Sequence, residues 1–357
     1  MGKFGFIIHP LSARTDMARK YPLVRFLPER LIERLLKSMK PMMLSHITGV
    51  VGANGTQAEG WFGGCTLTAR QIVSFDPDFV VRRIVDTADL LAEAGAKVVG
   101  LGAFTAVVPD SGVSVAKAAR VPITTGNTYT VVTAVQGALE AARLMGHEIP
   151  SATAAVMGAT GSIGRVCAQM LSEKVSRTIL VGRDEGRLKA VAAQVRGECE
   201  ISTDPASSLP RADIVVTVTS ALDVVVFPEH LKPGAVVCDV ARPRDVSPQV
   251  ARKRKDVLAI EGGVVSVPGD VNFGFDFGFP PKTAYACMAE TMILALEERY
   301  EPYTLGRDLS IEKVREMAAL ADKHGFKLAG FRSFERAVTD GQIQTARALA
   351  RAKGANL

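Results

Sequence analysis

The feature that most constrains the fold is a glycine-rich turn between an apolar run and a helical pattern. Residues 154–164 read AAVMGATGSIG, and apolar residues at helical spacing follow them. In a strand, turn and helix of this kind, glycines let a pyrophosphate approach backbone N–H groups at the helix N-terminus. The spacing is GxxGxxG instead of the commoner GxGxxG, and a turn that only closes a βα unit has the same pattern. The setting between strand and helix favours a dinucleotide site.

The next apolar run, residues 177–181, indicates which dinucleotide binds. NAD sites usually have an Asp or Glu at the tip of this strand to hold the ribose hydroxyls, whereas Arg183 stands near the tip here. Its guanidinium suits the 2′-phosphate of NADPH. The alternative is that Arg183 meets only solvent and Asp184 binds the ribose. We expect the cofactor to contact Gly158, Thr160, Gly161, Ser162, Ile163, Gly164, Arg183 and Ser220.

Apolar runs alternate with helical patterns after residue 151, which predicts an α/β fold with a doubly wound parallel Rossmann sheet. The runs lie near 153–157, 177–181, 213–219, 235–239 and 257–260. A chain of 357 residues is long enough for a second domain. We expect an N-terminal α/β substrate domain, an NADP-binding domain and C-terminal helices that pack back, over residues 1–130, 131–282 and 283–357.

Cysteine use and hydropathy exclude several classes of protein. The five cysteines are scattered, without a CxxC pair or a Cys/His cluster, so we expect neither a metal site nor a disulfide framework. No apolar run reaches the ~20 residues that cross a bilayer, and the first residues lack the pattern of a signal peptide. The predicted location is the cytoplasm, with contact to a membrane surface left open. No nucleic-acid partner is expected.

The positive charge of the chain is concentrated near its N-terminus. Residues 1–45 contain nine Lys or Arg and three Asp or Glu, which accounts for the whole net charge of +6. Within this segment, residues 28–40 form a helical pattern with an apolar face and basic flanks. Such a helix can lie on an anionic membrane, dock an acidic protein or pack on its own domain. The sequence leaves these three interpretations open.

Cys287 is the candidate nucleophile. It lies near the start of a helical pattern that Thr283 can cap and that runs from Ala284 to about Arg299. The N–H groups at a helix N-terminus favour a thiolate, which is the reactive form of cysteine. Position alone leaves a structural role open, because a free cysteine is commonly a small buried hydrophobe. Cys65, in a Gly-rich turn, is the second candidate.

Four phenylalanines alternate in residues 272–281, which read NFGFDFGFPP. In an extended conformation the four rings share one face. Such a face could line a pocket for an acyl chain, and ordinary core packing explains the pattern equally well.

Taken together, these residues resemble the long-chain acyl-(acyl-carrier-protein) reductases of cyanobacteria. The resemblance covers most of the chain, and its blocks include FGFIIHPLS (4–12), LGAFTAVV (101–108), TTGNTYT (124–130), GATGSIG (158–164), AYACMAETM (284–292) and LGRDLSIEKV (305–314). It implies NADPH-dependent reduction of a fatty acyl thioester to the aldehyde, through an acyl intermediate on Cys287. Residues 20–45 and the tail beyond about 331 depart from the family's pattern, which leaves the acyl chain length and the partner undetermined.

The resemblance implies a substrate carried on acyl carrier protein or coenzyme A. Candidate donors to the tetrahedral oxyanion are Asn127, Thr128 and N–H groups at the helix start. One alternative is a shikimate/quinate-type NADP-dependent dehydrogenase, whose Asn-Thr-Asp signature is here Asn127-Thr128-Tyr129. The carboxylate that a polyol oxidation needs is therefore missing. The other alternative, a non-catalytic NADP-sensing protein, would keep the glycine turn and would need no thiol.

Overall fold

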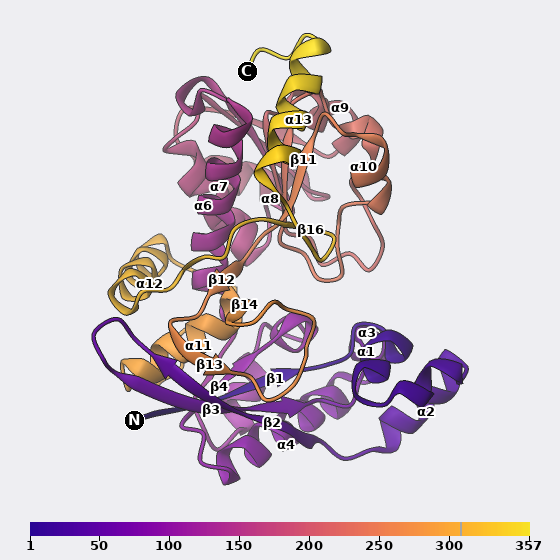
Figure 1. The fold of residues 1–357 in the computed structure, drawn as a ribbon, viewed down its shortest axis with the longest axis vertical. Coiled ribbons are helices and arrows are strands. Elements are labelled where there is room, and N and C mark those ends of the chain that lie inside the picture. The colour runs from indigo at the N-terminus through magenta and orange to yellow at the C-terminus, as the bar shows by residue number, and fades with distance from the viewer. Residues whose placement is uncertain (308) are drawn as a thin grey trace. The chain divides into compact units, whose positions relative to one another are not determined.

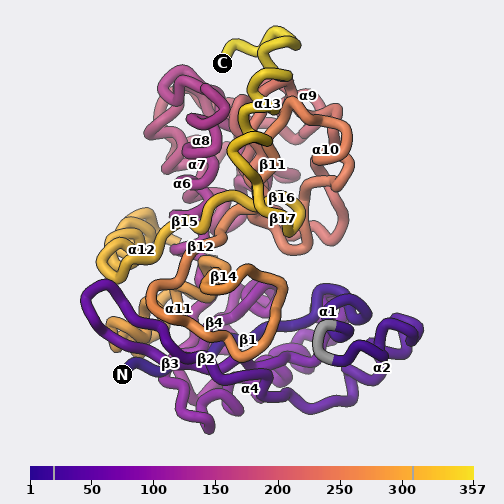
Figure 2. Tube along the Cα trace, in the orientation of Figure 1, coloured from indigo at the N-terminus to yellow at the C-terminus, as the bar shows by residue number. Residues whose placement is uncertain are grey.

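The computed structural model describes residues 1–307 and 309–357, with side chains throughout except at positions 19 and 20. These residues form two compact units (Figure 1). The first unit comprises Met1–Tyr129, Val265–Asp308 and Glu316–Lys327, and the second comprises Thr130–Val264, Leu309–Arg315 and Leu328–Leu357. The first unit is thus built from segments far apart in the sequence, as the indigo and orange parts of Figure 2 show.

The main sheet of the first unit has six strands in the order β13-β2-β3-β1-β4-β5. Strand β1 is parallel to β3 and β4, and β4 is parallel to β5, whereas β2 is antiparallel to β3 and β13 is antiparallel to β2. The bounds are β1 (Gly2–Ile8), β2 (Met42–Val51), β3 (Gln57–Gly64), β4 (Val98–Leu101), β5 (Ile123–Thr124) and β13 (Gly269–Asn272). Phe4, Phe6 and Phe62 contribute fully or almost fully buried rings.

Helix α4 (Pro77–Glu93) illustrates how local sequence specifies an element of this unit. The side chain of Asp76 accepts a hydrogen bond from the N–H of Phe79 at 3.0 Å, and Pro77 occupies the first turn. The buried residues recur at intervals of three or four and form one face: Val80, Ile84, Thr87, Ala88 and Leu91. The other helices here are α1 (Ala13–Lys20), α2 (Glu29–Ser38), α3 (Ala69–Ser74), α5 (Val113–Ala118), most of α12 (Ile311–His324), and the 3-10 helices η1 (Pro22–Phe26) and η2 (Ala103–Ala106).

Helix α11 (Ala286–Leu296) packs against β1 and β4 in the first unit. Ten of its eleven residues are buried, and Cys287 is the partly exposed one. At Gly100 of β4 the helix comes so close that an added Cβ atom would overlap the hydroxyl of Thr291 and lie 2.6 Å from the ring of Phe6. A helix that is apolar nearly all round is typical of one surrounded by protein.

The sheet of the second unit has six parallel strands in the order β11-β10-β9-β6-β7-β8. The bounds are β6 (Thr153–Met157), β7 (Arg177–Val181), β8 (Glu198–Ser202), β9 (Ile214–Thr217), β10 (Val236–Asp239) and β11 (Leu258–Glu261). The strand order reverses between β6 and β9, which is the switch point of a doubly wound sheet. The predicted fold class is therefore confirmed.

The sequence pattern predicts five of these six strands and misses β8. This edge strand reads ECEIS, and its five residues are partly or fully exposed, so it lacks the apolar run of a central strand. The helices of the second unit are most of α6 (Asn127–Met145), α7 (Ser162–Ser172), α8 (Glu185–Ala192), α9 (Pro205–Ser208), α10 (Pro248–Lys253), α13 (Asp340–Ala352), and the 3-10 helices η3 (Ile149–Ser151), η4 (Leu209–Arg211) and η5 (Pro228–His230). A short hairpin pairs β16 (Arg332–Ser333) with β17 (Arg336–Ala337).

The two units differ from the predicted domains in two respects. Residues 265–282 belong to the first unit, because β13 pairs with β2 instead of extending the Rossmann sheet. The C-terminal helices do not form a part of their own, since α11 belongs to the first unit and α13 to the second. A third, three-stranded sheet has the order β14-β12-β15, with bounds Thr283–Tyr285, Val264–Ser266 and Lys327–Leu328.

The predicted cap of the Cys287 helix is wrong. Thr283 lies in β14, and its hydroxyl donates a hydrogen bond to the carbonyl oxygen of Pro280 at 2.7 Å. Helix α11 begins three residues later, at Ala286. Cys287 therefore lies in the first turn, closer to the helix N-terminus than the sequence pattern indicates.

We predict that Gly100→Ala lowers the free energy of unfolding by about 1–3 kcal/mol, because the added methyl group overlaps Thr291 and Phe6 and pushes α11 away from β4. Urea titration followed by far-UV circular dichroism measures the change. Gly341→Ala in α13 is the matched control, since its nearest neighbour would be 4.0 Å away. An unchanged stability for Gly100→Ala would contradict the close packing of α11.

Candidate functional site

The thiol of Cys287 lies at the start of the buried helix α11, where it is the second residue. The first N–H groups of any helix have no acceptor within it, and the helix dipole places partial positive charge there. This location favours the thiolate over the neutral thiol. Cys287 therefore lies near a helix start, where the sequence pattern places it.

A second helix begins beside this thiol. Helix α6 follows Gly126, whose φ of +72° lies in the left-handed region that favours glycine. A Cβ atom at Gly126 would overlap the Cα and Cβ atoms of Cys287, so the two backbones are in direct contact. Asn127, which is partly exposed, is the first residue of α6. The structure therefore brings Asn127 and Cys287 together at two converging helix N-termini.

A fully buried carboxylate connects these two helix starts. Glu290 lies three residues after Cys287 in α11 and is 0 % exposed. Its oxygens accept four hydrogen bonds, from Thr124 Oγ1 at 2.7 Å, Thr304 Oγ1 at 2.9 Å, the N–H of Tyr129 at 3.1 Å and the hydroxyl of Thr128. An ionised side chain is rarely buried unless it is hydrogen-bonded in this way. Glu290 thus fixes the start of α6 and the segment around Thr304 against α11.

Thr128 has a different position from the one expected of an oxyanion donor. It is fully buried, its hydroxyl donates to Glu290, and Thr304 Oγ1 lies 3.4 Å away. Because that proton is already engaged, the hydroxyl cannot stabilise an oxyanion at the same time. Sequence reasoning missed Glu290, although a single Glu inside the apolar run of α11 was the available signal.

The other four cysteines are poor nucleophiles. Burial raises the pKa of both Cys65 and Cys167 to about 12, and it raises the pKa of Cys238 as well. Cys199 is half-buried, and its pKa is raised by burial and by the charge of Glu200. Cys65, the second candidate, is only 1 % exposed. The structure therefore favours Cys287 over Cys65.

An aromatic cluster extends from the sheet of the first unit to the residues before α11. The ring of Phe62 in β3 contacts those of Phe273, Phe275 and Phe277, with centroid distances of 6.1, 5.4 and 5.3 Å. Phe279 continues the cluster. Its ring lies 4.4 Å from that of Tyr285, which is two residues before Cys287.

The phenylalanine segment does not adopt the extended conformation in which its four rings would share one face. The chain turns at Gly274 and Gly278, both of which have positive φ, and the rings gather around Phe62 instead of along one strand face. Phe273 is buried, whereas Phe275, Phe277 and Phe279 are partly exposed. The segment therefore serves partly as core and partly as an apolar surface.

The glycine-rich turn joins β6 to α7 in the second unit. Gly158 has a φ of +83°, and a Cβ atom there would lie 2.9 Å from the carbonyl oxygen of Val218. A Cβ atom at Gly164 would overlap the carbonyl group of Gly158. Gly161 is the N-cap residue, so α7 begins with Ser162 and Ile163. A bare helix N-terminus at the carboxyl end of β6, beside the switch point, is where such sheets bind a pyrophosphate.

Two arginines lie near the tip of β7. Arg183 lies two residues after the end of β7, and its side chain is exposed. The carboxylate of Asp184 caps α8 by accepting a hydrogen bond from the N–H of Arg187 at 3.0 Å, so it is engaged locally. The guanidinium of Arg187 donates to the carbonyl oxygen of Thr160 in the glycine-rich turn at 2.8 Å. Sequence reasoning missed Arg187. Its spacing of four residues from Arg183 was the only signal.

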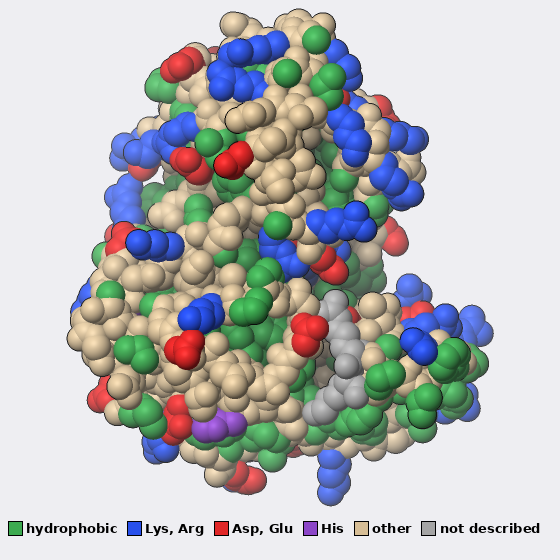
Figure 3. All heavy atoms as spheres, viewed as in Figure 1, with side chains coloured by type: hydrophobic (Ala, Val, Ile, Leu, Met, Phe, Trp, Pro, Cys, Tyr) green, Lys and Arg blue, Asp and Glu red, His purple; other side chains and the backbone are tan. Residues whose placement is uncertain are grey.

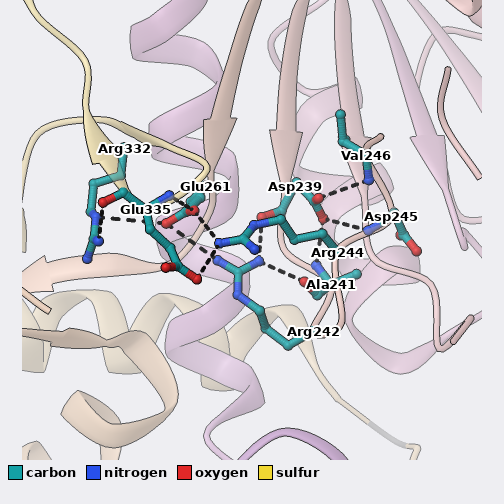
Figure 4. A network of polar contacts seen from close by, with 9 residues as sticks. All are labelled: Asp239, Ala241, Arg242, Arg244, Asp245, Val246, Glu261, Arg332 and Glu335. Atoms are coloured by element: carbon teal, nitrogen blue, oxygen red, sulfur yellow. Dashed lines mark hydrogen bonds and ion pairs between the residues drawn. The ribbon is translucent and has the colours of Figure 1, made fainter. Parts of the chain in front are cut away.

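Ser220 and a charged network lie at the carboxyl ends of β9, β10 and β11. Ser220 is exposed in the loop after β9. Asp239, at the end of β10, accepts hydrogen bonds from the N–H groups of Ala241 and Val246 at 3.1 and 3.0 Å (Figure 4). Burial raises the pKa of Asp239 to about 6, while the charge of Arg242 acts in the opposite direction.

Glu261, at the end of β11, is the centre of the same network. Its side chain is 4 % exposed and pairs with Arg244 at 2.8 Å, with Arg242 and Arg332 at 3.8 and 3.9 Å (Figure 4). Glu335 joins through its N–H, which donates to Glu261 at 2.7 Å. The network fixes the loops at the edge of the sheet where doubly wound folds bind their ligands.

Within the described ranges, no group of three or more His, Cys, Asp or Glu side chains is arranged to hold a metal ion. Among the same residues, no helix has both the length and the apolar character that a bilayer crossing requires.

Comparison with known proteins identifies relatives for both units. Residues 140–261 match the shikimate/quinate 5-dehydrogenase family. This matched range includes the glycine-rich turn and Arg183. The long-chain acyl-[acyl-carrier-protein] reductase of Synechococcus elongatus is 27 % identical over 342 residues, which cover 91 % of this chain and 98 % of that protein. Aminotransferase PigE of a Serratia species is 31 % identical over 338 residues, but the chain spans only 39 % of the length of PigE.

The comparisons also find a further sequence relative and solved structures with a similar fold. Glutamyl-tRNA reductase of Sorangium cellulosum is 26 % identical over 215 residues, which cover 56 % of this chain and 39 % of that protein. Among solved structures, L-tryptophan dehydrogenase from Nostoc punctiforme is similar over 99 % of this chain and 88 % of that chain, with a TM-score of 0.41 and 14 % identity. The family match and the sequence relatives support an oxidoreductase that uses a nicotinamide cofactor.

We predict that, at about pH 8, iodoacetamide alkylates Cys287 before any other cysteine, because only a thiolate reacts. Burial keeps Cys65 and Cys167 neutral at that pH, since their pKa values are about 12. Peptide mass spectrometry after a short reaction identifies the labelled residue. Unfolding in urea should then expose the remaining thiols. Equal labelling of Cys65 and Cys287 in the folded protein would contradict this assignment.

Proposed function

We propose that this protein reduces a long-chain fatty acyl thioester to the fatty aldehyde with NADPH, through an acyl group carried on Cys287. The observation that carries the proposal is the placement of this thiol: it is the one partly exposed residue of an otherwise buried helix, it lies in the first turn, and the backbone of Gly126 contacts it. A cysteine kept only for packing would be buried, as Cys167 and Cys238 are. The similarity to an acyl-[acyl-carrier-protein] reductase along 91 % of the chain supports the same function.

The first step is acyl transfer to the enzyme. The Cys287 thiolate attacks the carbonyl carbon, and a new carbon–sulfur bond forms while the carbonyl oxygen becomes an oxyanion. The oxyanion collapses, the bond between the carbonyl carbon and the carrier sulfur breaks, and the carrier leaves as a thiol after taking up a proton. N–H groups at the starts of α11 and α6 and the amide of Asn127 are the proposed donors to the oxyanion. Thr128 contributes indirectly, because it holds Glu290.

The second step reduces the enzyme-bound acyl group. NADPH supplies a hydride to the acyl carbon when it is bound. The same donors then stabilise the hemithioacetal oxyanion, and its collapse breaks the bond to Cys287 and releases the aldehyde. Cys287 returns as a thiolate, so the chain needs no further reductant. The carrier leaves before the reduction, which is the order of a ping-pong mechanism.

Several groups of the second unit support the choice of NADPH. The starting N–H groups of α7, at Ser162 and Ile163, suit the pyrophosphate, and Gly164 lets the helix start pack closely on the turn at Gly158. Arg183 and Arg187 suit the 2′-phosphate, because guanidinium groups make bidentate hydrogen bonds to phosphate oxygens. The carboxylate of Asp184 caps α8, which argues against the alternative that it binds the ribose.

The aromatic cluster supports a fatty substrate. The partly exposed rings of Phe275, Phe277 and Phe279 form an apolar surface that continues to Tyr285, two residues before the thiol. An acyl chain that follows this surface would have its carbonyl end near Cys287. The carrier is either acyl carrier protein or coenzyme A, since both present the acyl group as a thioester.

We predict that mixing the protein with palmitoyl-coenzyme A, without NADPH, adds the mass of one acyl group to the Cys287 peptide. Cys287→Ser should form no thioester and no aldehyde, because the hydroxyl lacks the reactivity of a thiolate. Intact-protein and peptide mass spectrometry detect the adduct, and gas chromatography detects the aldehyde.

Cys65→Ser is the matched control and should keep both the adduct and the aldehyde, because Cys65 is buried. The absence of any adduct on the wild-type protein, tested also with palmitoyl-acyl carrier protein, would overturn the proposal. If that protein still bound NADPH, the result would favour the dehydrogenase or the sensing alternative.

We predict that Arg183→Ala together with Arg187→Ala weakens NADPH binding about a hundredfold or more and weakens NADH binding far less. Each substitution removes a guanidinium and with it a charge-assisted hydrogen bond of about 1.5–3 kcal/mol. Only NADPH has the 2′-phosphate that accepts such a bond. Fluorescence titration measures both dissociation constants. Arg252→Ala in α10, also an exposed arginine, is the control. Equal losses for the two cofactors would overturn the assignment of the 2′-phosphate site.

A further inference from the structure

Exposed large apolar side chains are concentrated in one short segment of the first unit. Twelve such side chains occur in the described part of the chain, and six of them lie between residues 11 and 35: Leu11, Tyr21, Leu23, Phe26, Leu31 and Leu35. Leu23 and Phe26, both in η1, are 80 % and 72 % exposed. A concentration of this kind marks an interaction site. We call residues 11–40 the docking segment.

Helix α2 shows how the docking segment is arranged. Ile32 and Leu36 are buried and pack in a small cluster with Ala13 of α1. Leu31 and Leu35 each precede one of these buried residues and form a neighbouring row on the helix. Their side chains are 42 % and 51 % exposed. The apolar face of α2 is therefore wider than its own core needs. At 100° per residue, the next row beyond the two leucines is basic, and it consists of Arg30, Arg34 and Lys37.

The acidic side chains of α2 lie on the opposite side of the buried row and face other parts of the unit. Glu29 accepts a hydrogen bond from Ser12 Oγ at 3.3 Å, and Glu33 accepts one from Thr68 Oγ1 at 3.4 Å. Asp16 accepts hydrogen bonds from the N–H groups of Leu11 and Ser12 at 2.7 and 3.0 Å. These three carboxylates are engaged with neighbouring groups, so the outward side of the segment is apolar and basic.

The exposed basic side chains of the docking segment include Arg25, Arg30, Arg34 and Lys37. The guanidinium carbon of Arg25 lies 4.7 Å from the centre of the Phe26 ring. Figure 3 shows basic and apolar side chains side by side over α2. Arg and Lys combine a long apolar stem with a charged tip, so they can stay at a headgroup layer while neighbouring apolar side chains enter the acyl region.

We propose that the docking segment binds the surface of an anionic lipid bilayer. Leu23 and Phe26 enter between the lipid chains, and the basic row of Arg30, Arg34 and Lys37 meets the phosphate groups. Protruding apolar side chains favour lipid over an acidic protein, because a fluid bilayer accepts them without a matching cavity, whereas a folded partner must supply complementary shape. This inference does not rest on the proposed reaction, since it uses only the exposed side chains of the segment.

The test is flotation of the full-length protein with vesicles of phosphatidylglycerol and phosphatidylcholine. Wild type should float with the mixed vesicles, bind pure phosphatidylcholine more weakly, and be released by added salt. Leu23→Asp together with Phe26→Asp should lower the partition coefficient about tenfold or more, because each side chain no longer leaves water. Arg30→Glu together with Arg34→Glu should abolish the preference for anionic lipid.

Matched controls separate the docking segment from a general effect of apolar or charged residues. Leu349→Asp in α13 removes a leucine that is 40 % exposed, and Arg252→Glu with Lys253→Glu reverses two exposed charges in α10. Both controls should bind vesicles like wild type. Thermal unfolding checks that each variant is folded, and the acyl adduct on Cys287 reports the proposed reaction separately.

Two outcomes would overturn the lipid proposal. The first is that the variant with both Leu23→Asp and Phe26→Asp floats with anionic vesicles as fully as wild type does. The second is no binding to anionic vesicles together with salt-sensitive binding of acyl carrier protein that Arg30→Glu with Arg34→Glu abolishes. That result would assign the segment to an acidic protein instead.

Discussion

The first unit depends on how the buried side chain of Glu290 is hydrogen-bonded. A fully buried carboxyl group must have hydrogen-bond partners on both oxygens, and here four donors supply them. Each donor or acceptor left unsatisfied in such a place costs about 1–3 kcal/mol. The requirement therefore fixes α11, the start of α6 and the segment around Thr304 in one arrangement. Cys287 takes its position from that arrangement, since it lies one turn before Glu290 on the same helix.

The parts of this protein that follow from the sequence are those that local pattern determines. The glycine-rich turn, the strands β6, β7, β9, β10 and β11, and the location of Cys287 near a helix start can all be predicted from neighbouring residues. The start of α11 cannot, because Thr283 makes its hydrogen bond to Pro280 in β14 and does not cap the helix. Strand β13 is also unpredictable locally, since its partner β2 lies more than 200 residues earlier in the sequence.

The candidate site shows the same division between local and long-range information. Gly158, Gly161 and Arg183 can be identified from the motif and its spacing. The contact of Gly126 with Cys287 and the hydrogen bonds of Glu290 join segments about 160 residues apart, so no pattern within one element indicates them. Thr128 illustrates the consequence: its type suggests a hydrogen-bond donor, and only the fold shows which acceptor already uses its proton.

The C-terminal segment completes the charged network of the second unit. Arg332 approaches Glu261 at 3.9 Å, and the N–H of Glu335 donates to the same carboxylate. Glu261 is almost fully buried, so its negative charge must be balanced. Arg242 and Arg244 supply part of the positive charge, and both lie in the loop after β10. A second source of positive charge and of hydrogen bonds ties the loops after β10 and β11 to the hairpin β16-β17. The edge of the sheet that binds ligands in doubly wound folds is thereby held by two segments of this unit, the loops after β10 and β11 and the hairpin near residue 334.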